Sequence, residues 1–250
     1  GDFAGMIPGV SLVIAFSFYL ISQISKQTIL QELQNQVEGI ASVAATDIRL
    51  SYLTAIQAEE DIYTGEFQRV LNQLNMFRRT NSDIRFLHTW RPNPNSSQNQ
   101  WLVIVDSVPI DFDRNFDGEI APSESGRKPL TELSDPPRMM DTSYIEKIPV
   151  SGIVTDSRGK FLRAFAPVID LDRSVPIALV GVDIEYSTVQ ERFSNINRAL
   201  TFVAVVFILL FTTGLILYFK SKQALMRGRL LEQKIQKQNE ELCQNELYLG

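Results

Sequence analysis

Two stretches of the chain lack any charged side chain and are apolar along most of their length. They cover residues 3–25 and residues 199–219. A helix needs about 20 consecutive apolar residues to cross the roughly 30 Å hydrocarbon core of a membrane. The pattern therefore predicts two transmembrane helices, with a polar segment of residues 26–198 between them.

The first part of that segment has the spacing of a helix. Residues 26–57 contain no proline, and their apolar side chains recur at intervals of three and four residues. We expect one long helix over residues 26–57 that continues the first span. A second helix is predicted over residues 66–79, where the same spacing returns.

The spacing then changes to the alternation that is typical of β-strands. The predicted strands cover residues 84–91, 101–106, 144–150, 160–169 and 176–184. A last helix is expected from near Ser187 into the second span, because Ser-Thr-Val-Gln at residues 187–190 fits a capping box. Strands joined by short turns predict an α+β fold, in which helices pack on one face of a single antiparallel sheet.

Charges beside the spans indicate the orientation. Lys220, Lys222, Arg227 and Arg229 follow the second span before any acidic residue, and such basic clusters stay on the cytoplasmic side. Residues 26–198 carry 18 basic and 24 acidic side chains. We therefore expect this segment outside the cytoplasm and both ends of the chain inside. A cleaved signal peptide is the alternative for the first stretch, although its apolar core would be only about 7–15 residues long.

Scarce residue types exclude several kinds of site. The single cysteine, Cys243, excludes an internal disulfide framework and a Cys-rich zinc site. The single histidine, His88, excludes a multi-histidine metal centre. A net charge of −5 without a long basic run gives no sign of nucleic-acid binding. An ectoenzyme within residues 26–198 is an alternative, but His88 is its only base of near-neutral pKa and no nucleophile motif accompanies it.

The acidic segment at residues 113–124 matches the calcium-loop pattern at every specified position. Calcium takes six to eight oxygen ligands, and the glycine at position 118 permits the sharp turn that such a loop needs. The predicted ligands are Asp113, Asn115, Asp117, the backbone carbonyl of Glu119, and Glu124. We expect an isolated EF-hand-like loop that binds Ca²⁺ weakly and has a structural role. The alternative is a solvated acidic turn.

Four segments together resemble the Cache family, the PAS-like extracellular sensor domains that lie between two membrane spans of bacterial receptors. They are Asp-Ile-Arg-Phe-Leu-His-Thr-Trp-Arg at residues 83–91, Trp-Leu-Val-Ile-Val-Asp at 101–106, Gly-Lys-Phe-Leu-Arg-Ala-Phe-Ala-Pro-Val-Ile-Asp at 159–170 and Val-Gly-Val-Asp-Ile at 180–184. The resemblance implies that residues 26–198 form one Cache module in the periplasm or outside the cell. It also implies a small-molecule ligand and a multi-pass protein of the bacterial inner membrane.

Four side chains are candidates for contact with such a ligand. His88 and Trp90 share one face of the strand at residues 84–91, while Arg163 and Asp183 lie on other strands of the same sheet. An arginine is the usual partner of a carboxylate because its planar fork binds two oxygens. The alternatives are a histidine hydrogen-bonded within the fold and an arginine and aspartate that belong to structural ion pairs.

Residues 220–250 predict a cytoplasmic coiled-coil helix. Apolar side chains fall on the heptad seam at Ala224, Leu231, Ile235, Leu242 and Leu249, with polar or small residues between them. The pattern favours a homodimer over an exposed single helix. Because the sequence stops within this pattern, we expect an output domain after residue 250, as in a sensor histidine kinase of a two-component system. A diguanylate or adenylate cyclase, a chemoreceptor and a scaffold without output are the alternatives.

Overall fold

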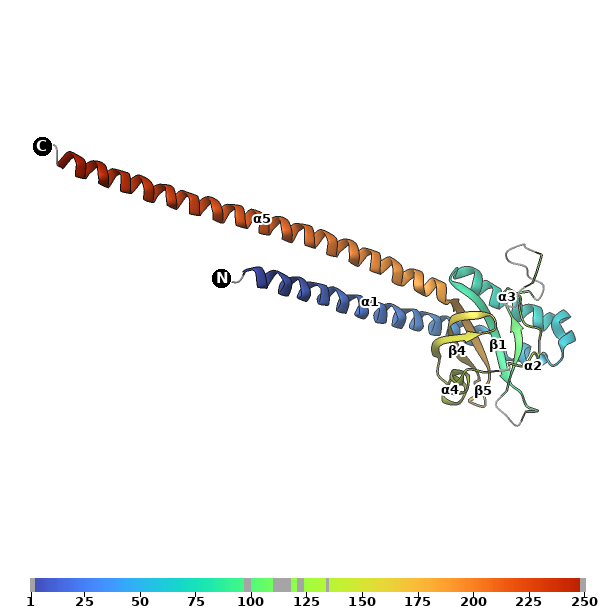
Figure 1. Cartoon of the computed structure of the whole chain (residues 1–250). Coiled ribbons are helices and arrows are strands. Elements are labelled where there is room, and N and C mark those ends of the chain that lie inside the picture. Colours follow the sequence, from blue (N-terminus) through green and yellow to red (C-terminus); the bar gives the residue numbers. More distant parts are fainter. Residues whose placement is uncertain (1–2, 97–99, 110–117, 121–123, 134, 248–250) are drawn as a thin grey trace. The chain divides into compact units, whose positions relative to one another are not determined.

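The computed structural model describes residues 3–96, 100–109, 118–120, 124–133 and 135–247. By its internal contacts the chain divides into a unit of residues 20–195 and a unit made of residues 1–19 and 196–250. The first unit contains a five-stranded sheet with its short helices, and the second consists of helix (Figure 1).

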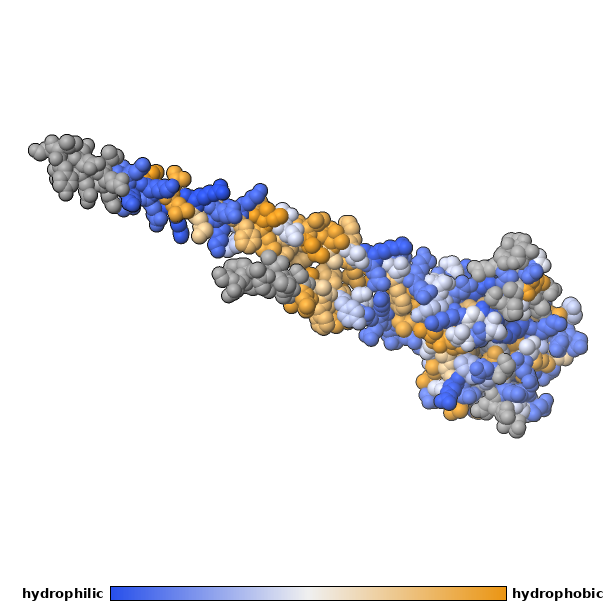
Figure 2. All heavy atoms as spheres, viewed as in Figure 1, coloured by the Kyte–Doolittle hydropathy of each residue, from blue (hydrophilic) through white to orange (hydrophobic). Residues whose placement is uncertain are grey.

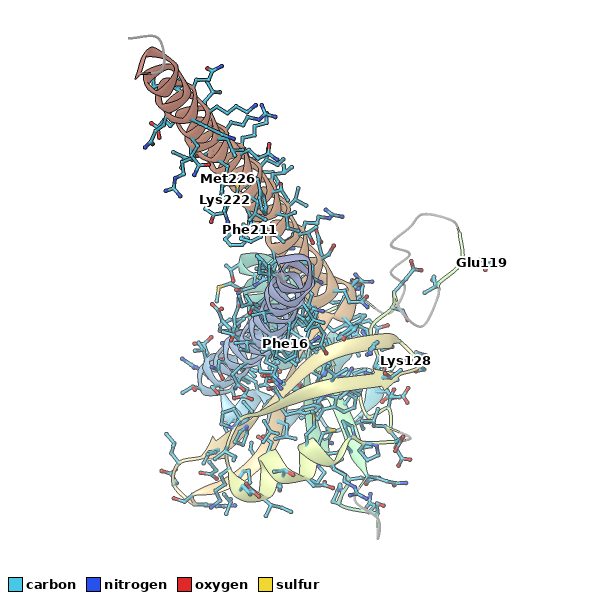
Figure 3. The ribbon with its side chains drawn as sticks, turned by 60° about the vertical axis from the view of Figure 1, so that its left-hand side comes forward. Phe16, Glu119, Lys128, Phe211, Lys222 and Met226 are labelled. Carbon is cyan, nitrogen blue, oxygen red and sulfur yellow. The ribbon has the colours of Figure 1, made fainter. Side chains whose placement is uncertain are left out.

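Two long helices carry the apolar stretches. They are α1 (Phe3–Asp47) and α5 (Tyr186–Leu247). Each has hydrophobic side chains on its exposed surface (Figure 2), and Phe16 and Phe211 are labelled on them in Figure 3. Both helices are long and apolar enough to cross a membrane, by length and composition. The residues of both predicted spans are therefore helical. That these helices cross a membrane stays a prediction.

The sheet is antiparallel throughout, in the order β2-β1-β5-β4-β3. Its strands are β1 (Ile84–Pro92), β2 (Trp101–Asp106), β3 (Val150–Asp156), β4 (Gly159–Asp170) and β5 (Val175–Glu185). The β1–β2 pair and the β3-β4-β5 meander meet where β1 pairs with β5. The predicted α+β fold with one antiparallel sheet is therefore confirmed.

One face of the sheet forms the main hydrophobic core with the helices. The second half of α1, α2 (Leu50–Ala55) and α3 (Gly65–Thr80) contribute buried apolar side chains to this core, and the 3-10 helix η1 (Glu59–Tyr63) joins α2 to α3. Thr64 caps the start of α3. Its hydroxyl accepts a hydrogen bond from the backbone N–H of Phe67 and so satisfies one free donor of the first turn. The helices therefore fill this face of the sheet with apolar side chains.

The short helix α4 (Arg138–Glu146) covers part of the opposite face. Its Met140 packs with Trp90, Trp101 and Phe165 in a second, smaller apolar cluster. The predicted strand over residues 144–150 was wrong, because this segment ends α4 and only Val150 enters β3.

The burial of side chains against the sheet explains why this segment is a helix and not the predicted strand. Met140 and Ser143 are three residues apart and both buried against the sheet, which requires the spacing of a helix. The hydroxyl of Ser143 also donates to the backbone carbonyls of Ile148 and Phe165. Lys147 then ends the helix in the left-handed conformation, with φ 59°.

The predicted single helix over residues 26–57 was also wrong in one respect. It breaks after Asp47 and resumes as α2. Arg49 is extended at the break, with φ −71° and ψ 123°, and this turn lets Leu53 and Ile56 enter the core under the sheet. The burial of two large side chains outweighs the local preference for a continuous helix.

Candidate functional site

The four predicted ligand-contact residues lie together on the sheet face opposite α1 and α3. His88 pairs with Gly181 across β1 and β5, and Arg163 pairs with Asp183 across β4 and β5. Directly paired residues of antiparallel strands share a face, and so do residues two apart in one strand. The register therefore brings His88, Trp90, Arg163 and Asp183 to one face, as the alternation predicted for the first two.

Arg163 and Asp183 form a buried, two-pronged ion pair. The Arg163 Nε atom lies 2.5 Å from Asp183 Oδ1, and Nη2 lies 2.7 Å from Oδ2. Nη2 also donates to Asp156 Oδ2 at 2.9 Å. Burial by itself would lower the pKa of Arg163, but the Asp183 and Asp156 carboxylates outweigh it and raise that pKa. This geometry favours the ion-pair alternative for Arg163 over direct contact with a ligand.

A second buried ion pair involves residues that the sequence did not single out. Arg158 Nη1 lies 3.0 Å from Asp106 Oδ2, and the two side chains are 2% and 1% exposed. The guanidinium of Arg158 also stacks on the Phe86 ring, with its carbon 3.3 Å from the ring centroid. Arg158 belongs to the turn between β3 and β4, and Asp106 ends β2. Sequence spacing carried no signal for this pair, which depends on strand register.

A third arginine is brought to the site by the segment after β2. The backbone N–H of Arg127 donates to Asp106 Oδ2 at 3.2 Å, and its guanidinium lies 3.6 Å from Asp156 Oδ2 and 5.2 Å from the Trp90 ring centroid. The neighbouring Gly126 approaches backbone so closely that a Cβ there would lie 1.8 Å from the Val108 carbonyl oxygen. This close approach holds Arg127 over Trp90.

His88 is fully buried and packs on backbone and ring. Its imidazole lies edge-on to Trp90, with ring centroids 5.1 Å apart. A Cβ at Gly181 would lie 2.4 Å from His88 Nε2, so only glycine leaves room for the imidazole there. Burial, and then the nearby charges of Arg163, Arg158 and Arg127, hold the pKa of His88 well below its ordinary value. His88 is therefore neutral at pH 7.

Several buried nitrogen atoms of this face lack a hydrogen-bond partner among the described residues. They are Nδ1 and Nε2 of His88, Nε1 of Trp90 and Nη1 of Arg127. More than nine in ten buried polar groups are normally paired, so four such atoms on three adjacent side chains are a marked exception. These atoms have an unused capacity to form hydrogen bonds.

The predicted calcium loop falls largely outside the described residues. Asp113, Asn115 and Asp117 lie there, whereas Glu119 is exposed (labelled in Figure 3) and Glu124 is buried. Gly118 has φ 87°, the left-handed conformation that the turn of such a loop requires. Within the described part of the chain, no three His, Cys, Asp or Glu side chains are grouped to hold a metal. Calcium binding stays a prediction.

A pH-dependent stability is expected from His88. Its folded pKa is lowered, so the unfolded chain, with a histidine pKa near 6.5, takes up a proton that the folded state excludes. Stability should be complete above pH 7 and fall by up to about 1.4 kcal/mol per pH unit as the pH drops from about 6.5 to 5. Denaturant unfolding at several pH values measures this.

Because His88 is the only histidine, the His88→Gln variant is a direct control for the pH effect. Its stability should be nearly flat between pH 7 and pH 5, before the carboxylates begin to titrate. An equal slope in the wild type and the variant would contradict a buried neutral histidine.

Neither a protein-family model nor a curated protein matches the chain. Among solved structures, it is similar to the ligand-binding domain of the Campylobacter jejuni chemoreceptor Tlp3 in complex with 4-methylisoleucine, with 12% identity and a TM-score of 0.41. The match covers 70% of this chain and 58% of the Tlp3 chain. A methyl-accepting chemotaxis protein X has 8% identity and a TM-score of 0.40, and the match covers 75% of this chain and 66% of that protein's chain.

An extracellular domain assigned to a histidine kinase, soHK1S-Z6, has 10% identity and a TM-score of 0.30, with 67% and 66% covered. These neighbours are receptor sensor domains, the class whose fold the sequence resembles. At such identities and TM-scores the likeness assigns no ligand, partner or output domain to this chain.

Proposed function

We propose that this chain is the sensing and membrane-anchoring part of a bacterial receptor, and that the polar face of its sheet binds a small molecule. The observation that carries the proposal is the set of unpartnered nitrogen atoms on His88, Trp90 and Arg127. Unpaired buried donors are costly, and a bound molecule with acceptors would satisfy them. The face is held by rigid strands and two buried ion pairs, which suits a preorganised site.

The charges of the face indicate the kind of ligand. Three arginines are matched by three aspartates: Arg127, Arg158 and Arg163 face Asp106, Asp156 and Asp183. The ligand therefore needs no large net charge. It must offer acceptors to the Trp90 indole and the Arg127 guanidinium, and it meets a neutral His88 that can donate with one ring nitrogen and accept with the other. A zwitterionic amino acid or a purine meets these demands.

The path to an output starts at β5. Glu185 ends this strand and Tyr186 begins α5, with no linker residue between them. The helix α5 is continuous through the apolar stretch of residues 199–219. A ligand that binds two arrangements of the sheet with different affinity shifts their populations, and α5 is attached directly to the sheet that would move.

We propose a sensor histidine kinase as the full-length protein, with residues 26–198 outside the cytoplasm of the inner membrane. The basic residues after the second span, including the exposed Lys222 (Figure 3), support this orientation. Leu231 and Ile235 are exposed on α5, as the seam of a homodimeric coiled coil requires. A chemoreceptor or cyclase would use the same sensor domain and membrane helices, and the sequence after residue 250 decides between these output domains.

An ectoenzyme is the rival from a different class. It would need a nucleophile within hydrogen-bond reach of His88. In the described part of the chain neither ring nitrogen of His88 has a hydrogen-bond partner. The site therefore supports binding and offers no support for nucleophilic catalysis.

A thermal-shift screen of residues 1–250 in lipid nanodiscs tests the sensing proposal. Amino acids, carboxylates and purines are the compounds, and a ligand at a hundredfold excess over its Kd should stabilise the chain by about 2.7 kcal/mol. Trp90→Phe and Arg127→Gln should weaken that binding, because each removes a donor atom, Trp90 Nε1 or Arg127 Nη1, that has no hydrogen-bond partner among the described residues.

Trp101→Phe is the matched control for Trp90→Phe. The Trp101 indole already donates to Asp141 Oδ1 at 3.1 Å, so its loss should leave ligand affinity unchanged. If no compound shifts the melting temperature, or if both tryptophan variants bind alike, the polar face is not the sensing site.

A further inference from the structure

A cleft lies where the end of α3 meets the start of β1 and the start of α5. Its volume is about 390 Å³, within the range of small-molecule sites. The charged residues of its lining are Arg78, Arg79, Arg85, Asp83 and Glu185. No residue of the site proposed for sensing belongs to this lining, so the two sites are distinct.

Both acidic side chains of the cleft are already paired with a cation. Glu185 Oε1 lies 3.1 Å from Arg85 Nε. The Asp83 carboxylate accepts a hydrogen bond from Arg192 Nη2, and Arg192 is not part of the lining. The lining has three arginines against two acids, and one of those acids is neutralised from outside. The cleft therefore keeps two positive charges that these acids do not balance.

The two unbalanced charges belong to Arg78 and Arg79, the arginine pair in the last turn of α3. Arg78 is half-buried and Arg79 is exposed. Neither has a hydrogen-bond or ion-pair partner among the residues that the structure describes. Burial lowers the pKa of Arg78; the Asp106 carboxylate opposes this effect, and the charge of Arg79 adds to it. The two guanidinium groups therefore repel each other, and a bound anion would remove that repulsion.

Basic residues in the last turn of a helix commonly pair with its terminal carbonyl groups. In α3 other side chains have this role. The Thr80 hydroxyl donates to the carbonyls of Met76 and Phe77, and the Asn81 side-chain amide also donates to Phe77. In the described part of the chain the arginine pair makes no such hydrogen bond. Helix capping therefore does not account for the two arginines.

A β-bulge shapes the neighbouring wall of the cleft. Between Ile84 and Phe86, β1 gains one residue relative to β5, so Arg85 is an extra residue in the strand. Residues two apart normally share a face of a sheet. Here Ile84 packs in the main core and Phe86 in a separate cluster. Bulges occur beside binding sites, where they redirect a side chain, and this one lies at the Arg85–Glu185 ion pair of the cleft.

We propose that this cleft binds a phosphate group through the arginine pair. Each guanidinium offers parallel N–H donors that match two phosphate oxygens, and the two positive charges balance the anion. The Arg85–Glu185 ion pair forms the opposite wall. Thr188, in the first turn of α5, also lines the cleft, so a bound phosphate would link α3 to the helix that leads into the second apolar stretch.

The phosphate group has two possible sources, a soluble phosphate compound or a phospholipid headgroup. In the sequence, only residues 193–198 separate Arg192, the partner of Asp83, from the second apolar stretch. Basic residues close to a membrane span attract anionic headgroups. The lipid source rests on the proposed membrane anchoring, whereas the soluble source does not. Neither source depends on the polar face of the sheet.

The test is the melting temperature of residues 1–250 in maltoside detergent micelles, which contain no phosphate group. Sodium phosphate or short-chain phosphatidylglycerol is added at constant ionic strength. A saturable rise with phosphate alone assigns a soluble compound, and one with phosphatidylglycerol alone assigns a headgroup. The double variant Arg78→Gln, Arg79→Gln should weaken binding by about tenfold or more, because charge-assisted hydrogen bonds are lost. Arg79→Gln alone changes only an exposed side chain and should weaken binding in the same direction.

The control double variant Lys128→Gln, Arg138→Gln removes the same total charge from exposed residues outside the lining (Lys128 is labelled in Figure 3) and should bind as the wild type does. Trp90→Phe should also retain phosphate binding, even if it abolishes binding of a ligand to the sheet face. The proposal is overturned if neither compound raises the melting temperature up to 10 mM, roughly tenfold above a millimolar Kd. It is also overturned if the two double variants behave alike, or if Trp90→Phe abolishes the effect.

Discussion

Replacing Asp183 with asparagine is expected to destabilise the sheet unit by about 3–5 kcal/mol, the cost of leaving one member of a buried ion pair without its partner. Of its two carboxylate partners among the described residues, Arg163 would keep Asp156, which its Nη2 atom contacts. Its guanidinium is 1% exposed, so water cannot replace the lost carboxylate. Denaturant unfolding followed by tryptophan fluorescence measures the loss, because Trp90 and Trp101 are the two tryptophans of the chain and both are buried in this unit.

Two controls separate a buried charge from a general effect of charge loss. Asp83 pairs with Arg192 at the surface, where their side chains are 32% and 43% exposed, and Asp83→Asn should cost less than about 1 kcal/mol. The double variant Arg163→Met, Asp183→Leu should recover much of the stability lost in Asp183→Asn, because it removes both charges of this buried pair. Equal losses in Asp183→Asn and Asp83→Asn would show that the buried pair has no special role.

The elements with one clear hydrophobic period were predictable from the sequence. Residues 101–106 form β2 over the predicted range, and the helix predicted over residues 66–79 extends by one residue at each end. Residues 144–150 were misassigned because their apolar positions fit either period over so short a segment. The burial that decides for a helix comes from contacts of Met140 and Ser143 with the sheet, and these contacts cannot be read from local spacing.

The sequence predicted which residues of the candidate site lie together only where they belong to the same strand. Alternation placed His88 and Trp90 on one face, and the structure keeps them there. The pairing of Arg163 with Asp183 depends on the register of β4 against β5, and spacing along the chain does not set a register. Arg158 and Asp106 are 52 residues apart. Although Asp106 ends one of the segments quoted for the Cache resemblance, no role in a site was predicted for either residue, and such pairs become visible only when the strands are aligned.

Calcium is expected to raise the free energy of unfolding of the chain by about 2 kcal/mol at 5 mM, if the loop at residues 113–124 binds with a Kd near 10⁻⁴ M. Three carboxylates of this loop, from Asp113, Asp117 and Glu124, repel one another without a cation. The ion would remove that repulsion and fix the segment between β2 and α4. Unfolding of residues 1–250 in nanodiscs, in chelator and in calcium, measures the difference.

Four comparisons make the calcium result specific. Magnesium at the same concentration should stabilise less, because it requires near-octahedral geometry and dehydrates reluctantly. Asp113→Ala should remove the calcium effect, whereas Asp172→Asn, which neutralises an exposed acid in the turn before β5, should leave it unchanged. The Gly118 backbone, with φ 87°, adds a third variant, since Gly118→Val would strain the turn and should weaken binding without removing a ligand. If wild type and Asp113→Ala unfold alike with and without calcium, residues 113–124 form a solvated turn and bind no metal.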